Sequence, residues 1–130
     1  MAPPTPKRSV AGTIVTAIPA LFLAFDVGIK LADIPPVRES FARLGYPEAS
    51  GPALGLLEGL CLAAYLAPWT SVLGAILLTG YLGGAVATHL RVGDPLLTHT
   101  LFPVYVGALL WGGIFLREER LRALVPLRRS

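Results

Sequence analysis

Four apolar stretches alternate along the chain with short polar or proline-rich segments. They cover residues 9–31, 51–67, 70–90 and 97–116. A helix needs about 20 apolar residues to cross roughly 30 Å of hydrocarbon, so each stretch predicts a membrane span, the second near the lower limit of length. The pattern therefore predicts an all-α fold, a four-transmembrane-helix bundle.

The segment between the first two spans predicts a short interfacial helix. Pro35 and Pro36 are expected to end the first span, because proline cannot donate a helical hydrogen bond. Residues 37–44 then mix charged side chains with Val37, Phe41 and Leu44 at amphipathic spacing, which is typical of a helix lying at the membrane surface.

The remaining connections are short. Turns are expected at residues 45–47 and 91–95, and Trp69, in the connection after the second span, is a candidate interfacial anchor. Residues 1–8 are expected to form a disordered cytoplasmic N-terminus. Residues 9–117 are expected to form the membrane domain, and residues 118–130 a basic cytoplasmic tail.

Charge predicts which side each end faces. The start resembles a signal peptide, but residues 10–25 are long for its apolar region and no clean cleavage site follows, so an uncleaved first helix is expected. An N-in, C-in arrangement places seven basic residues inside and four at the outer side: Lys7, Arg8, Arg117, Arg120, Arg122, Arg128 and Arg129 against Lys30, Arg38, Arg43 and Arg91. The positive-inside rule favours this arrangement.

Composition agrees with a membrane protein. Hydrophobic residues make up 54% of the chain and charged residues 15%, with a mean hydropathy of +0.65; soluble domains carry about 25% charge. The net charge of +3 is explained by anionic lipid, since no nucleic-acid motif accompanies it. The expected location is a bacterial cytoplasmic membrane, as a multi-pass protein.

Small residues recur at helical spacing in two of the spans. Gly51, Gly55 and Gly59 do so in the second, and Gly80 and Gly84, continued by Thr88, in the third. Such stripes let helix backbones approach closely in lipid. Their partners are either helices of the same chain or those of a second protomer.

Five ionisable residues fall inside or at the ends of the spans. A charge at the bilayer centre costs roughly 2.5–3.5 kcal/mol, so such residues are normally paired and face the protein interior. With alternating span directions, all five are expected in the outer half of the membrane: Asp26, Lys30, Glu58, His89 and His99.

These residues and their neighbours predict a polar pocket. Glu58, Asp26 and His89 are the candidate acid–base residues, and Glu58 is expected to pair with Lys30 or His89 unless it is protonated. The candidate ligand-binding residues are Lys30, Tyr81, Thr88, Arg91, Asp94 and His99.

Structural alternatives exist for most of these residues. Asp26 and Lys30 are four residues apart and can neutralise each other on one helix face. The two histidines suit an interface, and Arg91 and Asp94 suit a turn in which Asp94 caps the element that begins at Pro95.

Metal and thiol chemistry have little support. No HxxxH or ExxH pair lies on any span, so a metal site is not predicted. The single Cys61 excludes an intrachain disulfide and a CxxC pair. No cofactor is specified by the sequence, although a quinone suits the pocket.

Four segments resemble the DoxX-like family of small four-helix membrane proteins. They are residues 25–31 (FDVGIKL), 41–47 (FARLGYP), 55–59 with Glu58 between two glycines, and 89–95 (HLRVGDP). The resemblance implies the four-helix fold. It also implies links with thiosulfate–quinone oxidation, thiol-stress oxidoreductase complexes, methylamine utilisation or, in a eukaryotic relative, receptor assembly.

Three functional hypotheses follow. The first is binding of a small lipophilic molecule such as a quinone in an outward-facing polar pocket, as a subunit or accessory of a membrane redox system. The second is an acid–base isomerase or hydrolase acting on a lipophilic substrate. The third is an assembly chaperone. Expected partners are the lipid bilayer, the lipophilic molecule, and a homo-oligomer or larger membrane complex, with no nucleic acid.

Overall fold

A computed structural model describes residues 10–128 of the chain, and these residues form helices and no strand. The all-α class is therefore confirmed. The elements are α1 (Val10–Ala32), α2 (Pro35–Leu44), α3 (Ser50–Leu66), the 3-10 helix η1 (Pro68–Thr70), α4 (Ser71–Arg91), the π-helix η2 (Leu96–Thr100), α5 (Phe102–Arg117) and α6 (Glu119–Arg122). The N-terminal segment predicted at residues 1–8, with Lys7 and Arg8, lies outside the described residues, as does Arg129.

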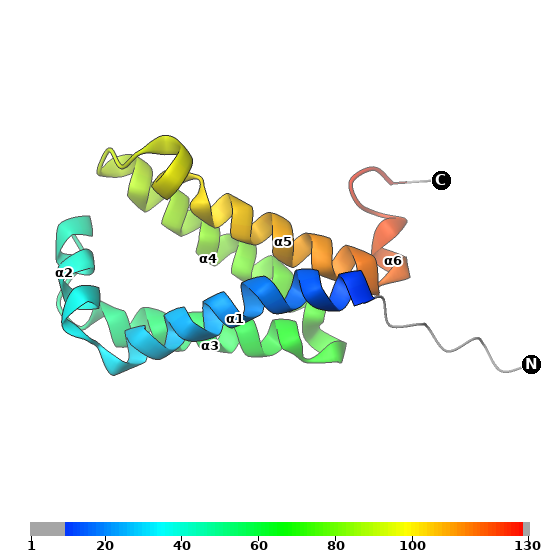
Figure 1. Ribbon diagram of the computed structural model, residues 1–130, viewed down its shortest axis with the longest axis horizontal. Coiled ribbons are helices and arrows are strands. Elements are labelled where there is room, and N and C mark those ends of the chain that lie inside the picture. The colour runs from blue at the N-terminus through cyan, green and yellow to red at the C-terminus, as the bar shows by residue number, and fades with distance from the viewer. Residues whose placement is uncertain (1–9, 129–130) are drawn as a thin grey trace, which may run out of the picture.

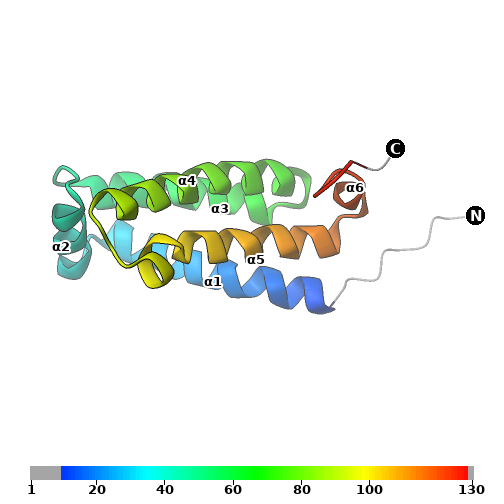
Figure 2. The same ribbon diagram turned by 90° about the horizontal axis from the view of Figure 1, so that it is seen from above.

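The four longest helices pack side by side around a common interior. α1 contacts α3 and α5, and α4 contacts the same two helices from the other side. α2 lies across one end and contacts α3, whereas Val10 and the final described residues lie at the opposite end (Figures 1 and 2). α4 and α5 diverge from α1 and α3 toward the α2 end (Figure 1).

Two prolines both end α1 and begin α2. Pro35 and Pro36 occupy the first helical positions of α2, where a missing N–H removes no helical hydrogen bond. α2 therefore starts two residues before the predicted position. It ends at Gly45, whose φ of 84° is the left-handed conformation that glycine adopts without strain.

The fourth apolar stretch is not one continuous α-helix. It is divided into η2 and α5, with Leu101 between them. In η2 the Thr100 and Leu101 amides donate to carbonyls five residues earlier, those of Pro95 and Leu96. Pro103 explains the change, because it has no N–H to donate and its ring needs space in the preceding turn.

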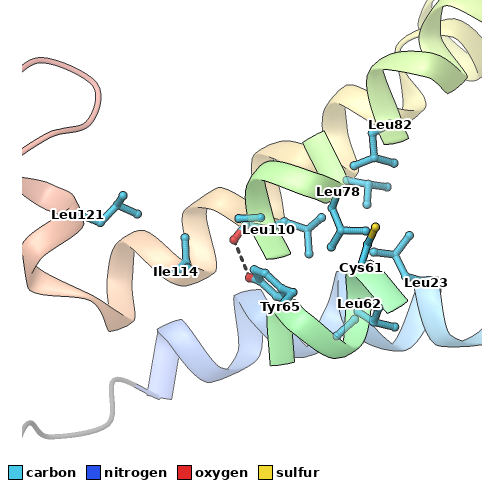
Figure 3. Close-up of a cluster of buried hydrophobic side chains, with 12 residues drawn as sticks. Leu23, Cys61, Leu62, Tyr65, Leu78, Leu82, Leu110, Ile114 and Leu121 are labelled. Carbon is cyan, nitrogen blue, oxygen red and sulfur yellow. Dashed lines mark hydrogen bonds between the residues drawn. The ribbon is translucent and has the colours of Figure 1, made fainter. Parts of the chain in front are cut away.

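The apolar core lies toward the end of the bundle opposite α2. Twelve buried side chains from α1, α3, α4, α5 and α6 form it (Figure 3). Tyr65 is fully buried there and donates its hydroxyl hydrogen to the Leu110 carbonyl at 2.6 Å. Leu121 extends the core into the tail, and Arg122 donates to the carbonyls of Phe115 and Leu116 at the end of α5. The start of the tail, α6, is thus packed against α5, whereas residues 122–128 are exposed.

The two glycine stripes have different surroundings. A Cβ at Gly55 would lie 2.8 Å from the Lys30 Cβ, and Cβ atoms at Gly51 and Gly59 would also contact residues from the end of α1 to the start of α2. The α3 stripe is therefore used within the chain. A Cβ at Gly80 or Gly84 would meet no atom within 4 Å, so the α4 stripe faces open space.

The outer surface is largely apolar. Among the described residues, three helical segments are long and apolar enough to cross a membrane: Val10–Ala32, Pro68–Arg91 and Leu96–Arg117. Ser50–Leu66 is apolar but shorter, with 17 residues. Many large hydrophobic side chains point outward, including Trp69, which is 85% exposed. Such a surface is suited to lipid and costly in water.

Candidate functional site

A cavity of about 670 Å³ is lined by residues of α1, α2, α3, α4, η2 and α5. Its walls are mainly apolar and include Phe22, Leu54, Phe102 and Val106. Ionisable and hydroxyl side chains also line it, from α1, α2, α3, α4 and η2. The cavity thus combines apolar walls with a small number of polar groups, as ligand sites commonly do.

Lys30 is the centre of an inner polar cluster formed with Asp26, Glu58 and Tyr81. Its ammonium group donates to Asp26 on the same helix, to Glu58 Oε2 at 2.8 Å and to the Tyr81 hydroxyl oxygen at 2.8 Å. The Tyr81 hydroxyl in turn donates to Glu58 Oε2 at 3.0 Å. The cluster therefore joins α1, α3 and α4.

Glu58 is the most deeply buried member of this inner cluster. Its side chain is 0% exposed, against 15% for Lys30 and 26% for Asp26. Only one carboxylate oxygen is bonded: Oε1 is buried without a hydrogen-bond partner among the described residues. Leaving a buried acceptor unpaired costs about 1–3 kcal/mol, so this oxygen favours a hydrogen-bond donor from a water or a bound molecule.

Local sequence explains how the inner cluster forms. Asp26 and Lys30 share a face of α1 because four residues make about one helical turn. The absent side chain at Gly55 allows α3 to approach the Lys30 Cβ, and Glu58 lies one turn further along α3 on an adjacent face. Lys30 can then reach the Glu58 carboxylate across the helix interface.

An outer cluster, Arg43, His89 and Asp94, links α2 to the end of α4. Arg43 donates to both Asp94 carboxylate oxygens, at 2.8 and 3.3 Å, and His89 Nδ1 lies 2.5 Å from Asp94 Oδ2. The Arg43 hydrogen bonds, followed by that from His89, lower the pKa of Asp94 to about 2. This stabilisation is present above about pH 4 and is lost as the pH falls through about 2.

Two further contacts hold the same elements together. The hydroxyls of Tyr46 and Thr88 are 2.8 Å apart, and Arg91 donates to the Leu44 carbonyl at 2.6 Å. The rings of His89 and His99 meet edge to face with centroids 6.3 Å apart. Together with the outer cluster, these contacts tie the C-terminal end of α2 to the C-terminal end of α4.

The structure divides the predicted site residues into groups. Asp26, Lys30, Glu58 and Tyr81 contact one another, and Lys30 rather than His89 is the partner of Glu58. Thr88, His89 and His99 line the same cavity nearer the α2 end, whereas Arg91 and Asp94 are not among its lining residues.

The expected capping role of Asp94 is wrong. η2 has no side-chain cap, and the Asp94 carboxylate is directed to Arg43 and His89 instead. The guanidinium of Arg43 offers a charged donor that a backbone amide does not match.

Arg43 and Tyr46 line the cavity, yet neither was predicted as a site residue. Both fall in the 41–47 segment that carried the family resemblance. The family resemblance of that segment could therefore have indicated them as site residues. Amphipathic spacing alone could not, because it assigns Arg43 to the solvent side of a surface helix.

Metal ligation has no structural basis in the described part of the chain. No group of three or more His, Cys, Asp or Glu side chains suited to a metal ion occurs among residues 10–128. The inner cluster instead offers hydrogen bonding and proton exchange. If fully ionised, it sums to one negative charge, from Lys30 against Asp26 and Glu58.

Apolar spans around an enclosed polar cluster define an all-helical integral membrane protein. The DoxX-like family model matches residues 14–113, which is most of the chain and includes α2 through η2. The chain therefore belongs to the DoxX-like family, and the resemblance seen in the sequence is confirmed. No curated protein and no solved structure was found to match it.

Proposed function

We propose that this protein binds a small lipophilic molecule of the quinone class in the cavity, as a subunit or accessory of a membrane redox system. The observation that carries the proposal is the inner polar cluster beside apolar walls in a space of about 670 Å³. Phe22 and Phe102 stack edge to face at 5.2 Å there and suit an aromatic ring or alkyl chain. Glu58, Lys30 and Tyr81 suit its polar head.

The open glycine stripe of α4 supports the same proposal. Gly80 and Gly84 line the cavity and leave room for a ligand where side chains would otherwise stand. Glycine in the middle of a helix is unfavourable by about 1 kcal/mol relative to alanine. Two glycines lining the cavity wall at this cost are suited to a surface that a ligand contacts.

Filling this space is expected to weaken binding. Gly84→Leu should weaken binding of 2-decyl-1,4-benzoquinone and its hydroquinone at least about tenfold, because the new side chain occupies ligand volume. Gly83→Leu is the matched control, since Gly83 is equally open but does not line the cavity. Native mass spectrometry and calorimetry on protein in lipid nanodiscs measure the effect. Unchanged binding in Gly84→Leu, or no binding to the unaltered protein, would refute the proposal.

We further propose that α1, α3, α4 and η2–α5 cross a bacterial cytoplasmic membrane four times, with both ends inside and α2 at the outer surface. Both described ends lie at the end opposite α2 (Figure 1). In the sequence, seven basic residues belong to the two terminal segments and four to the outer side in this arrangement, and the positive-inside rule favours that count.

This topology predicts a defined labelling pattern. A cysteine placed at Glu48, in the loop before α3, should react with a membrane-impermeant maleimide in intact cells. A cysteine at Glu119 should react only after permeabilisation. The native Cys61 is buried and contributes little background. The four-span model places three crossings, α3, α4 and η2–α5, between the two positions. Labelling of both from the same side would require an even number of crossings and would refute the model.

A further inference from the structure

We infer that the cavity recognises its ligand by a hydrogen-bond donor on the polar head, so that within the quinone class it binds the hydroquinone in preference to the quinone. The inference rests on the proposed function and names the form of ligand that the site selects. It depends on an inventory of donors and acceptors in the inner cluster.

The donors of this cluster are already used. An ammonium group has three N–H donors, and Lys30 directs them to Asp26, Glu58 Oε2 and the Tyr81 oxygen. The Tyr81 hydroxyl hydrogen is directed to Glu58 Oε2. While Glu58 is ionised, a quinone carbonyl, which only accepts hydrogen bonds, finds no free donor in the inner cluster.

A fully buried acceptor is left over, in contrast to Asp26, whose side chain is 26% exposed. Glu58 Oε1 is buried and has no hydrogen-bond partner among residues 10–128, although Glu58 lines the cavity. Two carboxylates share a single ammonium, so an ionised cluster carries surplus negative charge. That charge repels a carbonyl oxygen and attracts a hydroxyl hydrogen. A hydroquinone supplies the missing donor and a quinone does not.

Access to Oε1 requires side chains around it to move. Glu58 is fully buried although it lines the cavity. Lys30 and the Tyr81 hydroxyl hold its Oε2, so rotating the carboxylate would only exchange the two oxygens. A ligand hydroxyl reaches Oε1 when neighbouring cavity side chains shift to admit it. A ligand whose head stayed at the α2 end would instead meet His89 and His99, whose ring N–H groups donate, and there the quinone would be favoured.

Three ligands with one alkyl body test the inference. They are 2-decylhydroquinone, 2-decyl-1,4-benzoquinone and the dimethyl ether of the hydroquinone, titrated anaerobically into the unaltered protein in nanodiscs. We expect the hydroquinone to bind at least about tenfold more tightly than the other two, because they leave Oε1 unpaired. Glu58→Gln should reduce this ratio to near one, whereas Glu48→Gln, on the exposed loop, should leave it unchanged.

The outcomes separate the inference from the proposed function. If none of the three ligands binds, the proposed function itself is wrong. If the quinone binds as tightly as the hydroquinone, the proposed function stands and the inference is overturned. The final test ligand is a decyltrimethylammonium salt, which has a positive charge but no donor hydrogen. If it binds as tightly as the hydroquinone, the site recognises charge rather than a hydrogen-bond donor, and the inference is overturned.

Discussion

Lys30→Met is expected to destabilise the folded protein by about 3–5 kcal/mol, the cost of removing one partner from a buried ion pair. The methionine side chain has a similar length but no charge and no donor. It would leave the Asp26 and Glu58 carboxylates near each other without a cation between them. Tyr81 would lose the donor that its oxygen accepts. Thermal or denaturant unfolding of the purified protein in detergent measures the loss.

Two further variants test whether the loss comes from the inner cluster. Lys30→Met combined with Glu58→Gln should recover a large part of the stability, because one of the unpaired charges is then gone. Arg38→Met removes the cation from an exposed pair with Asp33, in which Arg38 is 67% exposed, and should change stability by about 0–1 kcal/mol. Equal effects of Lys30→Met and Arg38→Met would show that the inner cluster contributes nothing beyond a surface pair.

Gly74→Ala is expected to be the most disruptive of the small substitutions. A Cβ there would lie 2.1 Å from the Tyr65 backbone nitrogen and 2.3 Å from its Cα. Backbone atoms cannot move aside as a side chain can, so α4 would have to separate from α3. We expect a loss of about 3 kcal/mol or more, at or above the upper end of overpacking costs. The melting temperature in detergent or nanodiscs measures it.

Gly83→Ala is the control within the same helix. No atom lies within 4 Å of the position a Cβ would take, and alanine is a better helix former by about 1 kcal/mol. It should therefore leave stability unchanged or raise it slightly. A Gly74→Ala protein that melted at the same temperature as Gly83→Ala would refute the close contact between α3 and α4.

The two polar clusters have different structural tasks. The inner cluster joins three helices beside the cavity, through Lys30 and its three acceptors. The outer cluster and the Tyr46–Thr88 and Arg91–Leu44 contacts join α2 to α4 at the end where those helices would otherwise be held only weakly. Hydrogen bonds and ion pairs on both sides of the cavity thus hold the surrounding helices in place.

The helical elements and their approximate bounds could be predicted from the sequence. Apolar runs and prolines act locally, so the ends of α1, α3 and α4 fall within one residue of the predicted positions. The Asp26–Lys30 pair was equally accessible, because four residues along a helix always bring two side chains to one face. The fourth run was predicted less well, since the effect of Pro103 on the preceding turn depends on more than composition.

Which helices face each other, and at what rotation, could not be predicted from the sequence and is seen in the packed structure. The packing of the helices places Glu58 beside Lys30 and Tyr81 and pairs Arg43 with Asp94. It also packs the α3 glycines against α1, whereas Gly80 and Gly84 of α4 have no neighbouring atom within reach of an added Cβ. Helical periodicity states which residues share a face, but not which neighbour that face meets. Partners 23, 28 and 51 residues apart in the chain are set by close packing of whole helices, which a single sequence does not encode in any local pattern.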